Sequence, residues 1–324
     1  MATRWMKSIA HTQPDPGIHG QIVDSMSATT DKRTNAPSIR MAMSNGVPAG
    51  AVISYDGQTA PDGYRERSDL MDLSQLNATI AWYVQNGWLP AIPSGDVPAN
   101  MEDCSWAMLK QLASAGTLGN YYQIGDTKTI ELTGGERVVM ELVSINDGEG
   151  TAGAYYPRGT VDFISKDCMQ TTRSMNSSNT NAGGWVSCAL RTTLNTTIYE
   201  TLPQTVKDVI VEKTHKSSAG SQSTSLVEHS DKLWLPTEYE MFGAITYSAN
   251  TENANVNKHY AVFDTNADRI KHQGTNGSAV NWWGSSPRVS HSADFCGVYS
   301  DGSANNYGAS GSYGVPLCFR IGQS

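Results

Sequence analysis

Catalytic chemistry in this chain of 324 residues would have to come from its carboxylates, histidines or cysteines. Acidic residues are spread throughout, but Asp162, Glu238 and Glu240 stand at no spacing that is typical of an acid–base pair. None of the seven histidines forms the HxxxH pattern that suits zinc. Caps and solvated faces are therefore the favoured interpretation of the acids, and exposed strand or loop positions that of His215 and His229.

The cysteines argue against a disulfide framework. There are five of them, an odd number, and no two form a CxxC pair. Reduced and mostly buried thiols in a protein made in the cytoplasm are the favoured interpretation. Cys296 and Cys318 are 22 positions apart, and each lies in an apolar segment that favours a core position.

Residues 260–314 carry a different chemistry, that of molecular recognition. Their polar residues are mainly Asn, Ser, Asp, His, Tyr and Gly, the mix found in antibody binding sites, where Tyr supplies rigid contact area and small polar residues adapt their hydrogen bonds. Turn formation explains the glycines and some asparagines, whereas display is favoured for the tyrosines. The candidate ligand-binding residues are His272, Asn276, Arg288, His291, Asp294, Tyr299, Asp301, Asn305, Asn306, Tyr307, Ser312 and Tyr313.

Composition excludes several classes of partner. The formal net charge of -8 argues against a nucleic acid or an anionic membrane, since either would be met by a Lys/Arg-rich face. No apolar run approaches the roughly 20 residues that a membrane span needs, and the N-terminus lacks the apolar region of a secretory signal. We therefore expect neither nucleic-acid binding nor membrane insertion.

The elements that must position the candidate residues follow from hydrophobic spacing. Residues 101–115 have the spacing of a helix, with Asp103 as its N-cap and Gly116 as its stop. Residues 128–132 and 137–145 alternate on either side of a Gly-Gly turn, which is typical of a β-hairpin.

Further helices are expected at residues 185–194, in the segment that Pro203 opens, and at residues 238–242 behind Thr237 as N-cap. The order of elements predicts an α+β fold with two helices and a loop-rich antiparallel sheet. Core positions are expected for at least three of the tryptophans Trp185, Trp234, Trp282 and Trp283. Short strands are expected at residues 212–216, 233–235, 260–263, 280–283, 295–299 and 315–321.

The N-terminal part is of another kind. Residues 1–46 are short of apolar residues and are expected to form an arm that is extended on a partner or ordered only on assembly. Residues 51–55 are a short strand, with turn signals at 56–57 and 60–64.

Five motifs stand in this order along the chain: GGWVSCALRTTLN (183–195), LP (202–203), DKLWLPTE (231–238), WWGSSP (282–287) and GVPLCFRI (314–321). Together they resemble the motifs of an uncharacterised domain family that is widespread in gut bacteria and their phages. The chain departs from the family pattern at 284–285, with Gly-Ser for Leu-Arg, and at 316–317, with Pro-Leu for Arg-Pro.

That family is similar to a divergent branch of the C-type lectin fold, akin to formylglycine-generating-enzyme-like domains and to the variable proteins of diversity-generating retroelements. The resemblance implies that residues 314–321 are the closing strand of a scaffold and that the polar tract before them is a displayed loop. In retroelement-diversified proteins, mutation of Asn codons yields Asn, Asp, Tyr, Ser, His and Gly, which is the composition of this tract.

A second resemblance lies near the N-terminus, where VPAGAVISY (47–55) and TAPDGY (59–64) are similar to a segment of phage tail-fibre and collar proteins. The two resemblances together imply a phage tail-tip or tail-fibre receptor-binding protein, located in the virion tail after assembly in the host cytoplasm. Its expected parts are an N-terminal arm (1–46) for attachment or oligomerisation, a small β segment with linker (47–100), and a lectin-like ligand-binding domain (101–324).

The expected partners are a host cell-surface glycan or protein, other tail proteins bound through the arm, and two further copies in a homotrimer. The alternatives are a formylglycine-generating-enzyme-like oxidase, a tail-associated glycan hydrolase and a bacterial surface adhesin. The oxidase would need a close cysteine pair, and the hydrolase two carboxylates facing one cleft about 5–10 Å apart. No cofactor is expected; the alternative is calcium, for which Asp294, Asp301, Asn305 and Asn306 are the available ligands.

Overall fold

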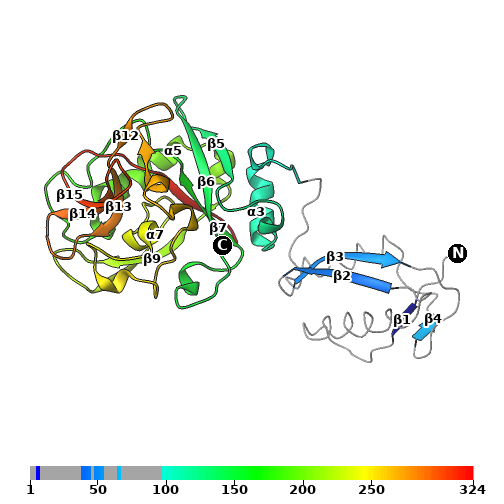
Figure 1. Cartoon of the computed structure of the whole chain (residues 1–324). Helices are drawn as coiled ribbons and strands as arrows, with labels where there is room; N and C mark the ends of the chain where they lie inside the picture. Colours follow the sequence, from blue (N-terminus) through cyan, green and yellow to red (C-terminus); the bar gives the residue numbers. More distant parts are fainter. Residues whose placement is uncertain (1–4, 8–37, 45–46, 55–63, 67–96, 324) are drawn as a thin grey trace. The chain divides into compact units, whose positions relative to one another are not determined.

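The computed structural model describes residues 5–7, 38–44, 47–54, 64–66 and 97–323. The chain divides into two compact units, Met1–Ala91 and Ile92–Ser324. In the first unit β2 (Ser38–Ser44) pairs antiparallel with β3 (Val47–Ser54), and β1 (Trp5–Lys7) with β4 (Tyr64–Glu66) (Figure 1). The strand predicted at residues 51–55 is confirmed as far as Ser54, where β3 ends. Tyr55, the predicted turn at 56–57 and residues 60–63 of the turn predicted at 60–64 lie outside the described residues, and Tyr64 begins β4.

The second unit is built on a five-stranded antiparallel sheet, in the order β5-β6-β7-β16-β8. Every residue of β7 is buried, because neighbouring elements cover both faces of this strand. β16, the last strand of the chain, lies between β7 and β8, so the chain end is part of the core. The bounds are β5 Thr127–Glu131, β6 Arg137–Ile145, β7 Thr160–Ser165, β8 Ile210–Val211 and β16 Cys318–Gly322.

The predicted hairpin of residues 128–145 is confirmed as β5 and β6. Gly134 and Gly135 form its turn with φ of 108° and 88°, a conformation that favours glycine. The strand predicted at 315–321 begins only at Cys318.

One helix, α3 (Trp106–Ser114), packs on the sheet through Trp106, whose ring lies edge-on to Phe163 at 5.4 Å and to Phe319 at 5.5 Å. Its N-cap is Ser105, which accepts a hydrogen bond from the Met108 amide, and not Asp103 as the sequence predicts. A 3-10 turn, η1 (Met101–Asp103), takes up the predicted first turn. Gly116 follows the helix with φ of 69°, as expected of a stop signal.

The middle helices are shorter than predicted. The helix expected from Trp185 begins with a 3-10 turn and becomes α-helical only at Ala189, and its later part is a π-helix. In chain order these elements are η4 (Trp185–Ser187), α4 (Ala189–Thr193), η5 (Leu194–Ile198), α5 (Tyr199–Thr201) and α6 (Gln204–Lys207).

A separate hairpin joins β9 (Lys213–Ser218) to β10 (Leu226–Asp231). The strand predicted at 212–216 is confirmed as β9, whereas residues 233–235 form no strand and make a single bridge between Trp234 and Cys318. The expected helical turn is confirmed as α7 (Glu238–Phe242), with a capping box between Thr237 and Glu240.

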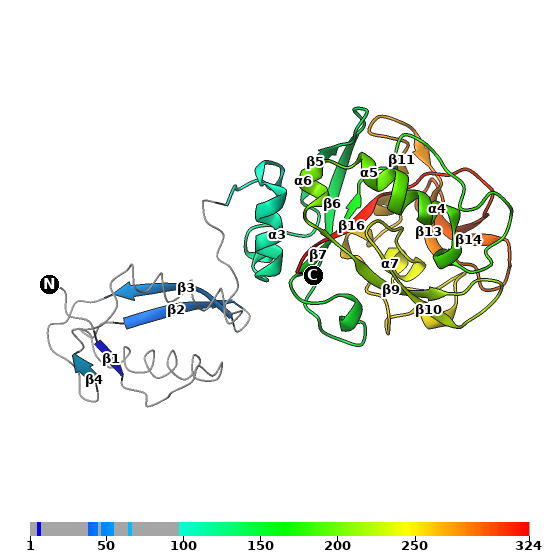
Figure 2. The ribbon, with the colours of Figure 1, turned by 180° about the vertical axis from the view of Figure 1, so that it is seen from behind.

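A second sheet, in the order β13-β14-β15, lies at the end of this unit that is farthest from α3 (Figures 1 and 2). β15 was not predicted, since its sequence, ANNYG, is polar and lies within the expected loop. Residues 261–263 form a 3-10 turn and not the expected strand, because Tyr260 and Phe263, one turn apart, both point into the core. The remaining elements are η2 Leu118–Asn120, η3 Gly153–Tyr155, η6 Asn250–Glu252, η7 Ala261–Phe263, η8 Ala267–Arg269, β11 Lys271–His272, β12 Ala279–Val280, β13 Trp282–Pro287, β14 Asp294–Val298 and β15 Ala304–Gly308.

The fold is therefore a mixed α+β architecture, as predicted. Among the described residues, no helix has the length and apolar character needed to cross a membrane. Trp185, Trp234, Trp282 and Trp283 are all buried, so the core prediction holds for the four tryptophans.

Candidate ligand-binding surface

The structure divides the twelve residues predicted to bind a ligand among three places. The first group surrounds the start of β14. The second lies along the β14–β15 hairpin and the residues after it, and the third lies on the β11–β12 hairpin. In that order they are Arg288, His291, Asp294 and Asn306; then Tyr299, Asp301, Asn305, Tyr307, Ser312 and Tyr313; and then His272 and Asn276.

The first group, here called the Arg288 cluster, is a connected set of four side chains. Arg288 Nη1 donates to Asp294 Oδ2 at 3.1 Å and to Asn306 Oδ1 at 2.7 Å. His291 Nδ1 lies 3.0 Å from the same Asp294 oxygen. His291 is 57% exposed and Arg288 30%, so both offer hydrogen-bonding groups at the surface.

Asn181 holds the backbone beneath this cluster in place. It is fully buried, and its Nδ2 donates to the carbonyl oxygens of Arg288, His291 and Asp294 at 3.2, 2.9 and 2.8 Å. Its Oδ1 accepts from the Ser221 amide. Sequence reasoning missed this positioning role, because Asn181 stands in a run of Ser, Thr and Asn that contains no distinguishing signal.

The loop of the β14–β15 hairpin displays Tyr299, which is 44% exposed. The Tyr299 amide donates to the Ser303 carbonyl, and the Gly302 amide donates back to the Tyr299 carbonyl, both at 2.8 Å. Asp301 accepts from the amide and hydroxyl of Ser303, and these hydrogen bonds lower the pKa of Asp301. The loop is therefore ordered by its own hydrogen bonds.

Tyr307 and Tyr313 lie behind this loop against Trp283. Their ring centroids are 5.8 and 5.0 Å from that of Trp283, and 4.3 Å from each other. Tyr307 is buried and Tyr313 half-buried, so Tyr307 belongs to the core and not to the displayed surface, contrary to the prediction.

Three other side chains that were predicted to bind a ligand form hydrogen bonds within the protein. Asn305 Oδ1 accepts from the Asn306 amide at 2.8 Å, and Ser312 Oγ donates to the Thr172 hydroxyl at 2.8 Å. His272 Nδ1 lies 3.1 Å from Asp167 Oδ1. Asn276 lies apart from the Arg288 cluster, on the loop between β11 and β12, where it lines an open cavity.

Residues of the motifs at 183–195 and 231–238 meet at a buried carboxylate, Asp231. It accepts from Trp185 Nε1 at 2.9 Å and from Arg191 Nε at 2.7 Å. Asn195 links this carboxylate to the residues that follow β10. Its Nδ2 donates to Asp231 Oδ1, and its Oδ1 accepts from the Leu233 amide. These motifs therefore tie α4, η5 and β10 together, which is a structural role.

A second buried charge network occupies the centre of the unit. Lys213 forms an ion pair with Glu240, and the Tyr260 hydroxyl donates to Glu240 at 2.9 Å and to Asp162 at 3.3 Å. Arg320 binds both oxygens of Asp162, which outweighs the effect of burial and lowers the pKa of that carboxyl. All of these side chains are at most 2% exposed.

The carboxylates that come close together are thus inside the core. Glu252 accepts from the Ser218 amide and the Ser286 hydroxyl, and Glu238 accepts from the Tyr247 and Ser248 amides. Both are also buried, and burial raises the pKa of Glu252 to about 7. None of these acids is placed to meet a substrate from solvent.

The prediction that His215 and His229 are exposed is wrong. They face each other across the β9–β10 hairpin, with stacked rings 5.3 Å apart, and both are buried. Their strands are polar in sequence, KTHKSS and LVEHSD, so hydrophobic alternation did not signal the buried face. Burial lowers the pKa of both imidazoles.

The five cysteines are free and buried, as predicted. Cys296 lies on β14 and Cys318 on β16, which belong to different sheets. Burial raises the pKa of both thiols well above the usual range, which favours the unreactive protonated form.

Among the described residues, no three His, Cys, Asp or Glu side chains come together as a metal site. Of the calcium candidates, the carboxylate of Asp294 is held by Arg288 and His291, and that of Asp301 by Ser303.

Comparison with known proteins gave one result. The model of a family described as Domain of unknown function (DUF6273) matches residues 159–323, just over half of the chain. No curated protein and no solved structure matches the chain significantly.

Proposed function

The chain belongs to the DUF6273 family, and on that premise we propose that residues 97–323 are a C-type-lectin-like ligand-binding domain of a phage tail-tip or tail-fibre receptor-binding protein. The ligand is a host cell-surface glycan or protein. The binding surface comprises the Arg288 cluster, the loop that displays Tyr299, and Asp301, Asn305, Ser312 and the exposed part of Tyr313.

One observation carries this proposal: short polar loops stand on a sheet whose inner side is packed and hydrogen-bonded. Trp283 is fully buried beneath Tyr313, and Asn181 holds the backbone under the Arg288 cluster. The scaffold therefore meets the entropic cost of ordering the loops before any ligand arrives. Preorganised polar and aromatic side chains of this kind suit recognition of a hydroxyl-rich or polar surface.

The alternative enzymes are less well supported by the described residues. Cys296 and Cys318 lie in different sheets with protonated thiols, which disfavours an oxidase. The neighbouring acids Asp162 and Glu240 are buried with Lys213 and Arg320, which disfavours a glycan hydrolase.

The rest of the proposal concerns assembly. The N-terminal arm attaches the protein to other tail proteins, three copies form the receptor-binding unit, and the assembled protein is located in the virion tail. Three copies would present three identical surfaces, and this raises avidity for a repetitive cell surface even where each contact is weak.

The test uses labelled full-length protein and a panel of bacteria from the host range. We expect binding to at least one strain, with a loss of about tenfold or more in the double variant Tyr299→Ala/His291→Ala. Gln111→Ala, at an exposed position on α3 at the opposite end of the unit, is the matched control and should bind as the wild type does (Figure 1).

Mass spectrometry of purified virions then tests the location. We expect the protein among the tail components. Its absence from virions that adsorb normally would overturn the assignment to the tail. Cell binding that survives the double variant would overturn the proposed surface. A protein found instead on the surface of the bacterium would favour the adhesin alternative.

A further inference from the structure

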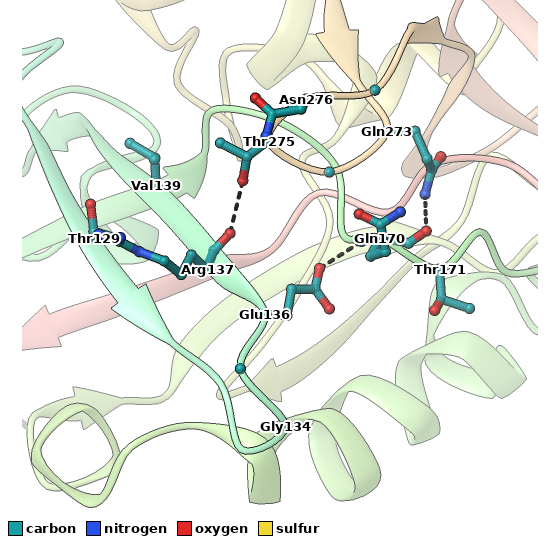
Figure 3. A pocket seen from close by; sticks show the side chains of 13 residues that line it. Thr129, Gly134, Glu136, Arg137, Val139, Gln170, Thr171, Gln273, Thr275 and Asn276 are labelled. Atoms are coloured by element: carbon teal, nitrogen blue, oxygen red, sulfur yellow. Dashed lines mark hydrogen bonds between the residues drawn. The ribbon is translucent and has the colours of Figure 1, made fainter.

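A cavity of about 870 Å³ is lined by no residue of the proposed receptor surface. Three segments enclose it: the β5–β6 hairpin around Gly134, residues 170–171, and the loop of residues 273–277 between β11 and β12 (Figure 3). Its volume lies in the range of small-molecule sites, roughly 300–1,000 Å³. Of the twelve residues predicted to bind a ligand, Asn276 alone lines it.

The walls of this cavity are tied to one another. Thr275 Oγ1 donates to the Arg137 carbonyl at 3.1 Å, which joins the loop to the hairpin. The backbone N–H of Gln170 donates to Glu136 Oε1 at 2.6 Å, which joins residues 170–171 to the hairpin. Figure 3 shows both bonds across the cavity. The shape is therefore formed before a ligand binds.

The loop approaches the second segment closely at Gly274. Its φ is 62°, and a Cβ there would lie 2.1 Å from Gln170 Oε1. Beside it, Gln273 Nε2 is held by the Gln170 carbonyl at 2.8 Å and by the Met169 carbonyl. Gln273 Oε1 is buried without a hydrogen-bond partner among the described residues, so it is an unsatisfied acceptor in the wall of the cavity.

We propose that this cavity binds a neutral saccharide. Its lining side chains are mostly amides and threonine hydroxyls, which can both donate and accept hydrogen bonds, as sugar hydroxyls do. Val139 is the one aliphatic side chain among the lining residues, so an apolar ligand would bury little apolar surface there.

The charges of the lining favour a neutral ligand over an ionic one. Arg137 is the one cationic and Glu136 the one anionic side chain among the lining residues, and they are neighbours in the chain. The formal charges of the lining therefore sum to zero, which favours a neutral ligand. Sugar hydroxyls can accept from a guanidinium and donate to a carboxylate.

A peptide that adds a strand to the sheet is disfavoured at this place. β5 is an edge strand, but the Thr129 amide already donates to Glu102 Oε2 at 2.7 Å. The Lys128 ammonium also donates to the Glu102 carbonyl, so η1 covers this part of the edge. The Thr129 amide, one of the main-chain groups that strand addition would use, is therefore occupied there.

Affinity for a single sugar should be weak, because no aromatic ring lines the cavity to stack on a sugar face. A dissociation constant on the order of 1 mM is expected for a monosaccharide. This inference does not rest on the receptor-binding function, since sugar binding in the cavity is independent of whether the chain belongs to a virion.

The test is saturation-transfer NMR on the full-length protein with about 10 mM glucose, galactose, mannose or N-acetylglucosamine, tenfold above the expected constant. N-acetylneuraminic acid serves as the anionic probe. We expect a signal from at least one neutral sugar, a loss of about tenfold or more in affinity in Asn276→Trp, and a loss of about three- to tenfold in Asn276→Ala.

Two controls make the test specific. Asn276 is exposed, and an unchanged thermal melt of Asn276→Trp shows that the variant is folded. Gln111→Ala, outside both the cavity and the proposed receptor surface, should keep the full sugar signal, and Asn276→Trp should keep cell binding. The cavity proposal is overturned if none of the neutral sugars binds, if Asn276→Trp binds them as the wild type does, or if the anionic sugar alone binds.

Discussion

Arg320 of the last strand donates to both carboxylate oxygens of Asp162 on β7, at 2.6 and 2.9 Å, and the two residues are partners in the sheet register. This ion pair is at most 2% exposed. β16 is therefore held in the sheet by a buried charge pair as well as by main-chain hydrogen bonds. The segment between β15 and β16 is anchored where it enters β16.

Removing one partner of this pair should strongly destabilise the domain. Arg320→Met leaves the Asp162 carboxylate buried with less compensation, so we expect the free energy of unfolding to fall by about 3–5 kcal/mol in urea titrations. The double variant Arg320→Met/Asp162→Leu should be less destabilised than the single one. Arg288→Met, at a partly exposed pair, is the control and should cost at most about 1 kcal/mol. A similar cost for both single variants would contradict the role given to burial.

Glu252 should make stability decrease as pH rises. Its folded pKa of about 7 lies above the ordinary value of 4.5, so its contribution is complete below pH 4.5 and is lost as pH rises through 7. In Glu252→Gln this loss is absent. We expect the stability of the variant relative to the wild type to rise by about 2–3 kcal/mol between pH 5 and pH 8. A difference that does not change with pH would show that Glu252 is ionised in the fold.

His215 should make stability decrease as pH falls, the opposite of the effect of Glu252. Burial, with Lys213 and His229 nearby, lowers its pKa well below 6.5, so its contribution is present above pH 6.5 and is lost as pH falls. His215→Phe should lose less stability than the wild type between pH 7 and pH 5, by up to about 2 kcal/mol. His272→Phe, at an exposed position, is the matched control. Equal acid sensitivity of wild type and His215→Phe would show that the imidazole is protonated within the fold.

Two of the tyrosines predicted to bind a ligand, Tyr299 and Tyr313, should respond differently to truncation. Tyr313→Ala removes a ring packed on Trp283 and should cost about 1–3 kcal/mol of unfolding free energy. Tyr299→Ala, at an exposed loop position, should change stability by no more than about 0.5 kcal/mol. Thermal and urea unfolding of both variants check this. Comparable stability losses would mean that Tyr299 packs in solution and is not displayed.

Local signals predicted the elements that depend on neighbours in sequence. The Gly-Gly hairpin, the Thr237 cap and the stop at Gly116 each follow from backbone preferences of a few residues. Two strands with polar sequences, β10 and β15, were missed. β10 and β15 are stabilised by cross-strand partners and by buried polar contacts, which no local pattern shows.

Part of the candidate surface could be predicted as well. The residue types that favour recognition pointed to the chain near β14 and β15, where the Arg288 cluster and Tyr299 lie. Composition could not separate Tyr299 from Tyr307, because exposure depends on which side of a strand faces Trp283. It could not place the cavity either, since three segments far apart in sequence enclose it.

The sequence by itself determined the mixed α+β composition, the buried thiols and the presence of the five motifs. Tertiary structure alone decided what those motifs do. Inside the protein, Asp231 accepts hydrogen bonds from Trp185 and Arg191. Asn195 connects this site to the Leu233 amide, and Arg320 pairs with Asp162. The reason is physical: a buried charge must find its partner in space, and that partner is not specified by distance along the chain.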